Sequence, residues 1–138
     1  SSRSHMLFTT HFVVKNSELN LNRRGKLHIC DLAGSERLDK SGAIVGGSLL
    51  KEAQHINKSL MALSNVIEKL QSKNPHHVPY RDSKLTYILQ DSLGGDSKTL
   101  AFICCNPLPT HYNESLCSIR FAAKVNKVEL KESHKFSC

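Results

Sequence analysis

The sequence contains no tryptophan, only three tyrosines and only five phenylalanines. None of these aromatic residues is interleaved with a run of basic residues, and such interleaving is what a stacking platform for nucleic-acid bases requires. Lys and Arg number 19 against 12 Asp and Glu, so the formal charge is +7. Nucleic-acid binding would rest on this charge alone, and we expect no nucleic-acid partner.

The sequence also lacks a long apolar run, a signal-peptide pattern and patterned cysteines. A membrane-spanning helix needs about 20 apolar residues; no segment approaches this length, so we expect a soluble chain without a membrane partner. The five cysteines include no Cys-x-x-Cys pair, which argues against a disulfide framework or a zinc cluster. We expect reduced thiols that pack as small apolar side chains. The His76-His77 pair has no Cys or carboxylate at ligand spacing, so we expect no metal there.

Two strands, a loop and a long helix are expected in the first half of the chain. Alternating apolar residues predict strands over 7–14 and 26–32, separated by a solvated polar loop over 15–25. A Gly- and Ser-rich loop follows, and Ser48 can cap the next helix, which should end near Asn74-Pro75. Apolar residues at spacings of three and four predict one buried face of this helix. The residues of that face are Leu49, Ala53, Ile56, Leu60, Leu63, Ile67 and Leu70.

The second half is expected to add two helices and one strand. Residues 81–92 predict a shorter helix, ended by Gly94-Gly95. Residues 99–105 are nearly all apolar, as in a strand buried on both faces. A last helix should run from about Asn113 to Val128, and a polar tail follows it. Strands and helices mixed in this way indicate an α/β layer structure. The residues of the last helix expected to face inward are Leu116, Ile119, Val125 and Val128.

The second strand ends in Asp31-Leu32-Ala33-Gly34. A carboxylate at the carboxyl end of a buried strand is well placed to hold Mg²⁺ through water. A glycine after it lets a backbone N–H approach a terminal phosphate. Asp-x-x-Gly alone is common, and it fits an ordinary turn at a strand end equally well.

Ser1-Ser2-Arg3-Ser4-His5 stands directly before the first strand. Its hydroxyls can ligate Mg²⁺ or position a water, and Arg3 can pair with a carboxylate such as Glu36. Alone, a Ser-rich terminus is usually disordered. Because the two segments flank adjacent strands, both can reach one γ-phosphate, which is the layout of two nucleotide switches.

Six segments, in this order along the chain, resemble the signatures of the kinesin motor domain. The resemblance covers residues 1 to about 128, and the chain end soon after the last segment is similar to that of C-terminal-motor, minus-end-directed kinesins. The segments are Ser1–His5, Asp31–Glu36, Ile56–Leu60, Val78–Thr86, Gln90–Gly95 and Arg120–Asn126.

The resemblance implies an α/β fold, the C-terminal portion of a P-loop NTPase-like motor domain whose central strands are flanked by helices. This portion would occupy residues 1–128, with a polar tail over 129–138, and would be incomplete without an upstream half. The resemblance further implies ATP and Mg²⁺ as cofactors of the complete domain, and microtubules as its partner. It implies a cytoplasmic, cytoskeletal location and a parent chain that dimerises through a coiled coil outside this segment.

The resemblance also implies the roles of single residues in ATP hydrolysis. Switch I corresponds to Ser1–His5, with Ser2 as the hydroxyl beside Mg²⁺ and Ser1 at the catalytic centre. In switch II, Asp31 binds a water of Mg²⁺, Gly34 senses the γ-phosphate, and Glu36 pairs with Arg3 when the switches close. The pair helps to position the attacking water.

Three basic residues fall where the family contacts tubulin: Lys58, Arg81 and Lys84. Tubulin's surface is strongly acidic, so Lys and Arg on one face would steer and hold it, although any single one also fits a solvated surface charge. Arg81 and Lys84 are expected three residues apart on one helix. Gln54 stands where the family often has a Lys, a departure that affects one microtubule contact.

The phosphate loop Gly-x-x-x-x-Gly-Lys-Ser/Thr does not occur in the sequence, because Gly46-Gly47-Ser48 lacks the lysine and the length. We therefore expect the chain alone neither to hydrolyse ATP nor to fold robustly, and to expose apolar strand edges. Two functions stay open. The chain is either the switch and microtubule-binding half of a microtubule-stimulated ATPase, or part of a kinesin-like module that binds microtubules without catalysis.

Overall fold

The computed structural model describes residues 4–18, 21–34, 47–72, 77–95 and 97–128. Ser1, Ser2, Arg3 and Glu36 lie outside these ranges, as do the expected loop residues up to Gly46 and the tail from residue 129. The chain divides into two compact units, Ser1–Gly34 and Ser35–Cys138. We call them the hairpin unit and the helical unit.

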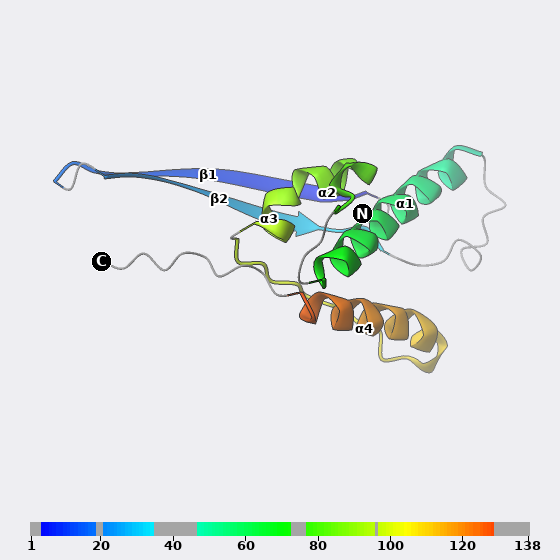
Figure 1. Ribbon diagram of the computed structural model, residues 1–138. Coiled ribbons are helices and arrows are strands. Elements are labelled where there is room, and N and C mark those ends of the chain that lie inside the picture. The colour runs from blue at the N-terminus through cyan, green and yellow to red at the C-terminus, as the bar shows by residue number, and fades with distance from the viewer. Residues whose placement is uncertain (1–3, 19–20, 35–46, 73–76, 96, 129–138) are drawn as a thin grey trace. The chain divides into compact units, whose positions relative to one another are not determined.

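The hairpin unit is built from two long antiparallel strands, β1 (Met6–Asn16) and β2 (Leu21–Asp31) (Figure 1). The ladder runs without interruption from the Met6–Asp31 pair to the Asn16–Leu21 pair. Both expected strands are confirmed, but the polar loop predicted over 15–25 is wrong, because most of that segment is paired. Backbone N–H and C=O groups form the ladder whatever the polarity of the side chains, and polar side chains on both faces remain hydrated.

One face of this hairpin is apolar and uncovered within the unit. Residues directly opposite in an antiparallel ladder share a face, so β1 and β2 together form one apolar stripe. The exposed fractions of its apolar side chains lie between 47% and 61%. Among the described residues, the two strands therefore bury no apolar side chain on this face. The stripe consists of Met6, Phe8, Phe12, Val14, Leu27 and Ile29.

The helical unit begins with α1 (Gly47–Leu70), 24 residues long. Leu63 and Ile67 of the predicted face are buried, whereas Ile56, Leu60 and Leu70 are half-buried. The prediction missed two buried positions on the same side, and the helix ends four residues before Asn74. The missed positions are Ala62 and Val66, and the partners that complete the core are Leu85, Leu89 and Leu93.

The single helix predicted over 81–92 is wrong. The structure has a 3-10 helix η2 (Tyr80–Asp82) and two short helices, α2 (Lys84–Ile88) and α3 (Gln90–Gly94). The first break is at Ser83, which is extended (φ −147°, ψ 156°) and caps α2 in a reciprocal capping box with Thr86. A serine that bonds the free N–H groups of a helix start favours a new helix there. The expected end near Gly94-Gly95 is confirmed.

The strand predicted over 99–105 is also wrong: this segment is neither helix nor strand. An extended segment becomes a strand only when a neighbour accepts and donates its backbone hydrogen bonds, and the described residues provide no such neighbour. Phe102 is consequently 85% exposed and Leu100 78% exposed. Cysteines in the described ranges are free but exposed, so the prediction that they pack as apolar side chains is wrong. They are Cys30, Cys104, Cys105 and Cys117.

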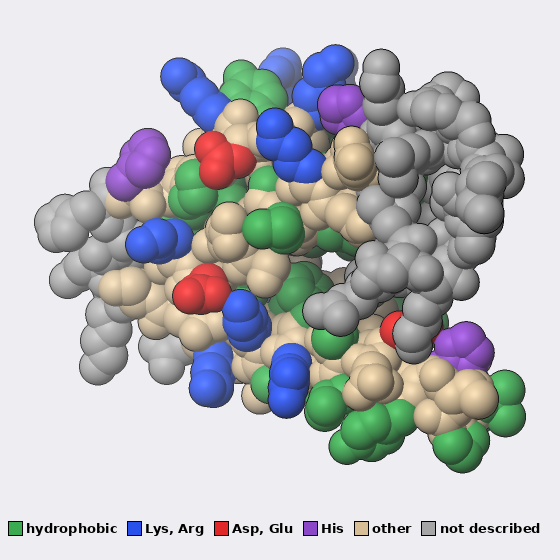
Figure 2. Space-filling model, turned by 90° about the vertical axis from the view of Figure 1, so that its right-hand side faces the viewer, with side chains coloured by type: hydrophobic (Ala, Val, Ile, Leu, Met, Phe, Trp, Pro, Cys, Tyr) green, Lys and Arg blue, Asp and Glu red, His purple; other side chains and the backbone are tan. Residues whose placement is uncertain are grey.

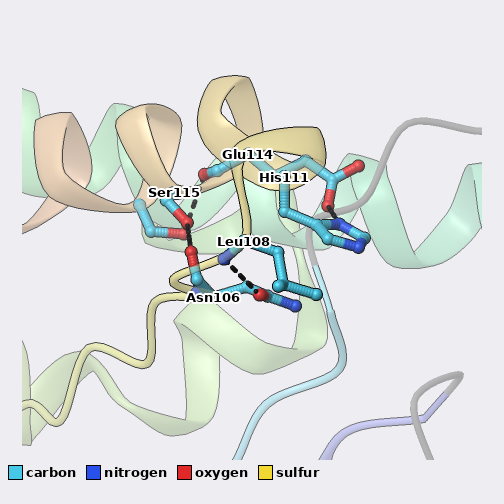
Figure 3. A network of polar contacts seen from close by, with 6 residues as sticks. Asn106, Leu108, His111, Glu114 and Ser115 are labelled. Atoms are coloured by element: carbon cyan, nitrogen blue, oxygen red, sulfur yellow. Dashed lines mark hydrogen bonds and ion pairs between the residues drawn. The ribbon is translucent and has the colours of Figure 1, made fainter.

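The last helix, α4 (Tyr112–Asn126), follows a 3-10 turn η3 (Pro109–His111). Ile119 was expected to face inward but is 54% exposed, whereas Leu116, Val125 and Val128 are half-buried. The start of α4 is held by polar contacts (Figure 3). The contacts at the start of α4 are Asn106 N–H to Ser115 Oγ (3.1 Å), Ser115 Oγ to Asn106 O (2.9 Å), Leu108 N–H to Asn106 Oδ1 (3.0 Å) and His111 Nδ1 to Glu114 Oε2 (3.1 Å).

Among the helices that the structure describes, none has the length and apolar character needed to span a membrane.

Two contacts join α4 to α1. Lys124 Nζ lies 2.8 Å from Glu68 Oε2, and Gln71 Nε2 donates to the Lys124 carbonyl oxygen at 3.0 Å. The hydrogen bond from Lys124 and its charge lower the pKa of the Glu68 carboxyl. We call these two contacts the α1–α4 clasp.

Candidate functional site

The two motifs expected to share an anion meet at the open end of the hairpin. Met6 and Asp31 form the last pair of the ladder, so the residues before Met6 and after Asp31 leave it from adjacent positions. Beyond this pair, Ala33 N–H donates a hydrogen bond of 3.0 Å to His5 Nδ1. The structure thus joins the end of the Ser-rich segment to the Asp-x-x-Gly segment.

The protonation of His5 fits this contact. A ring nitrogen that accepts a hydrogen bond carries no proton, so the proton of the neutral ring lies on Nε2. Burial lowers the pKa of His5, which favours the neutral form that can accept at Nδ1. Ala33 is 5% exposed, and a buried N–H without a partner costs about 1–3 kcal/mol. His5 therefore supplies a partner that this backbone group needs.

Asp31 and Gly34 occupy the other side of the junction. Asp31 is exposed at the end of β2, and the half-buried Gly34 comes three residues later. Mg²⁺ usually keeps several of its waters and takes only one or two carboxylates from a protein. In the described ranges no group of three or more His, Cys, Asp or Glu forms a cage for a metal, and the single exposed Asp31 carboxylate fits an ion held through water. Ser2, the expected hydroxyl ligand, lies outside those ranges, as does the Arg3–Glu36 pair.

The helical unit carries the second candidate site, a set of basic side chains. Lys58 lies on α1, Arg81 in η2 and Lys84 at the start of α2, and all three are exposed. The expectation that Arg81 and Lys84 share one helix is wrong, because the extended Ser83 separates their elements. Figure 2 shows Lys and Arg side chains distributed over one face, with few Asp and Glu side chains among them.

A shallow depression links α1 to η2 beside these residues. It has a volume of about 310 Å³ and brings Lys58 of α1 together with Asp82 of η2. Met61, also in its lining, is 67% exposed. The sequence analysis did not identify Met61 as a surface residue beside the basic side chains. Its position outside the predicted buried face of α1 could have indicated this. The lining residues are Lys58, Met61, Ala62, Asn65 and Asp82.

Comparison with known families gives one match that covers most of the chain. The kinesin motor domain matches residues 1–128. The chain belongs to the kinesin motor-domain family. The kinesin-like protein KIN-14C of Arabidopsis thaliana is 57% identical over 130 residues, which are 94% of this chain and 16% of that protein.

Solved kinesin structures have the same fold. The motor domain of the Kar3-like kinesin from Ashbya gossypii matches with a TM-score of 0.80 and 48% identity, over 91% of this chain and 40% of that one. A C-terminal motor and motor homology domain of Kar3Vik1, fused to a synthetic heterodimeric coiled coil, matches with a TM-score of 0.81 and 49% identity. That match covers 91% of this chain and 33% of the other. The α/β motor-domain fold and the similarity to C-terminal-motor kinesins are confirmed, and the chain spans well under half of each of these proteins.

Proposed function

We propose that this chain is the switch and microtubule-binding part of an ATP-driven microtubule motor. The observation that carries the proposal is the 3.0 Å hydrogen bond from Ala33 N–H to His5 Nδ1. This bond holds the end of the Ser-rich segment beside the Asp-x-x-Gly segment. It therefore supports the idea that both segments act on one phosphate. Residues 1–128 would form this part of the motor and residues 129–138 a tail.

In the proposed nucleotide site each segment contributes distinct groups. Ser2 and Asp31 would hold Mg²⁺, Asp31 through a water, while Gly34 would present its backbone N–H to the γ-phosphate and Ser1 would lie at the catalytic centre. Arg3 would pair with Glu36 when the segments close, and this pair would help to position the attacking water. Bound Mg²⁺ would neutralise charge that develops on the phosphates.

In the proposed microtubule site the basic side chains of the helical unit face an acidic surface. Lys58, Arg81 and Lys84 come from three elements, and α1 would be the relay helix that transmits loss of the phosphate. Opposite charges across an interface raise the association rate and set orientation. Such a motor would work on microtubules in the cytoplasm, and its parent chain would dimerise through a coiled coil.

The nucleotide role is tested in a complete motor domain in which residues 1–128 replace the matching part of the Ashbya gossypii motor. We expect Glu36→Ala or Arg3→Ala to lower microtubule-stimulated ATP turnover by about 100-fold or more, with nucleotide affinity largely kept. Glu18→Ala and Arg24→Ala, at the far end of the hairpin, are the matched controls. Unchanged turnover in the Glu36 variant would contradict the proposal.

The microtubule role is tested by co-sedimentation of the same chimera, with and without added DNA. Replacing Lys58, Arg81 and Lys84 by Ala should weaken binding and flatten its salt dependence, since charge attraction is screened by salt. Lys98→Ala, an exposed lysine of the helical unit, is the control. Competition by DNA would instead favour a nucleic-acid surface.

The second candidate is a microtubule-binding module without ATPase activity. These 138 residues contain no phosphate loop, and the residues upstream of Ser1 in the parent protein decide between the two candidates, because the switches act only on an anchored phosphate. A phosphate loop encoded upstream of Ser1 would exclude this candidate. We expect the 138-residue chain alone to show no micromolar affinity for MgATP, and titration calorimetry measures this.

A further inference from the structure

We propose that His5 is a positioning residue that couples the two switch segments by holding the Ala33 backbone. The inference rests on the proposed nucleotide function and names the contact through which one switch fixes the other. His5 itself need not touch the nucleotide: it would act through the peptide that precedes Gly34.

The position of His5 relative to the ladder makes this coupling possible. The ladder ends at Met6 and Asp31, so His5 is the first residue beyond it on one side, while Ala33 is the second residue beyond it on the other. The bond of 3.0 Å between His5 Nδ1 and Ala33 N–H continues the connection between the two segments beyond the last residue pair of the β1–β2 ladder. It does so with a side chain, which a single substitution can remove without altering the ladder.

The position of Ala33 next to Gly34 explains how the contact with His5 would affect the proposed nucleotide site. Ala33 is buried and immediately precedes Gly34, whose N–H is the proposed sensor of the γ-phosphate. A fixed Ala33 peptide restricts the orientations open to the Gly34 N–H, and backbone N–H groups held in place beforehand can bind a phosphate. A displacement of His5 with the Ser-rich segment would therefore displace the sensor.

The contact is tested first by amide hydrogen exchange of the chimeric motor domain described above, labelled with ¹⁵N-alanine. We expect His5→Ala to speed the exchange of the Ala33 amide by about tenfold, the value of one hydrogen bond. His5→Asn should keep most of the protection, because the Asn side-chain oxygen lies near the position of Nδ1. His11→Ala, in β1 and exposed, should change nothing at Ala33. An Ala33 amide that exchanges as an unprotected group in the unmodified chain, or equally fast with and without His5, would overturn the inference.

The consequence for function is tested in the chimeric motor domain described above. We expect His5→Ala to lower kcat for ATP by about tenfold with KM changed less than about twofold, and His5→Asn to recover most of kcat. Unchanged kcat, or a rise in KM alone, would overturn the positioning role. Unchanged turnover on Glu36→Ala would count against the proposed nucleotide function instead, and the exchange measurement would still decide whether His5 holds Ala33.

Discussion

The hairpin unit and the helical unit show two ways in which one chain forms secondary structure. The hairpin unit has an uninterrupted ladder from Met6–Asp31 to Asn16–Leu21, yet the side chains of its apolar stripe are exposed. The helical unit has three short, interrupted elements directly after α1, namely η2, α2 and α3, yet it buries a shared core. The strands are thus defined by their backbone hydrogen bonds, whereas the helices also pack around a shared core. The two units should therefore respond differently to the same kind of substitution.

The largest difference is expected when a large apolar side chain is truncated in each unit. Leu63→Ala removes a buried side chain of α1 and should lower the free energy of unfolding of the helical unit by about 3 kcal/mol. The amides of α1 should then exchange roughly 100-fold faster. Phe12→Ala removes a side chain that is 48% exposed and should change hairpin exchange only a few-fold, by about 1 kcal/mol or less. Hydrogen exchange with mass spectrometry measures both, and equal effects would refute the contrast.

The second-largest difference is expected when a glycine in each unit is replaced by alanine, which adds a methyl group. A Cβ on Gly94 would collide with the Tyr80 hydroxyl, whereas one on Gly25 would lie in ordinary contact, 3.9 Å from Phe12. We expect Gly94→Ala to cost about 1–3 kcal/mol, as overpacking does, and Gly25→Ala to be neutral or slightly stabilising. Urea unfolding followed by circular dichroism measures the loss.

Tyr80→Phe provides the control for this clash. Because it removes the colliding hydroxyl, Gly94→Ala should cost less in the Tyr80→Phe background than in the unmodified chain. Equal costs in the two backgrounds would show that the clash does not involve that hydroxyl.

A smaller effect is expected at the cap that separates η2 from α2. Ser83 Oγ accepts from Thr86 N–H at 3.1 Å, and the Thr86 hydroxyl donates to the Tyr80 carbonyl at 2.7 Å. Ser83→Ala should cost about 1 kcal/mol by removing the cap, while Ser83→Asp should keep it. Thermal unfolding compares the two variants, and a stabilised Ala variant would mean that the two elements prefer to merge into one helix.

The smallest effect is expected at the α1–α4 clasp. Lys124 lowers the pKa of Glu68 below its ordinary value of 4.5, so the clasp contributes stability above that pH, and the contribution is lost as pH falls through the lowered pKa. Glu68→Gln should therefore be slightly less stable than the unmodified chain near neutral pH and equal to it in acid. The pair is exposed to solvent, so the difference should also shrink in high salt. Unfolding curves at several pH values measure it.

The sequence predicted the strands, α1 and α4 because their apolar periods are local properties. It failed at Ser83, where a cap competes with continuation of a helix, and at residues 99–105, where the apolar character of a strand is present but the described part of the chain supplies no pairing neighbour. The motif Asp-x-x-Gly assigns Asp31 and Gly34 to the candidate site, and this assignment stays a prediction. The sequence did not indicate the His5–Ala33 bond, since that contact depends on the register of two strands and not on either segment alone.

The α1–α4 clasp fixes where the chain leaves its last helix. The Lys124 carbonyl and ammonium are both attached to the C-terminal turn of α1 and its extension, at Gln71 and Glu68, two residues before α4 ends at Asn126. An axial slide or a roll of α1 would drag this end of α4 with it and redirect whatever polypeptide comes after. A small rotation of α4 about its contacts at Lys124 would then displace the residues after α4 by a distance that increases along the chain.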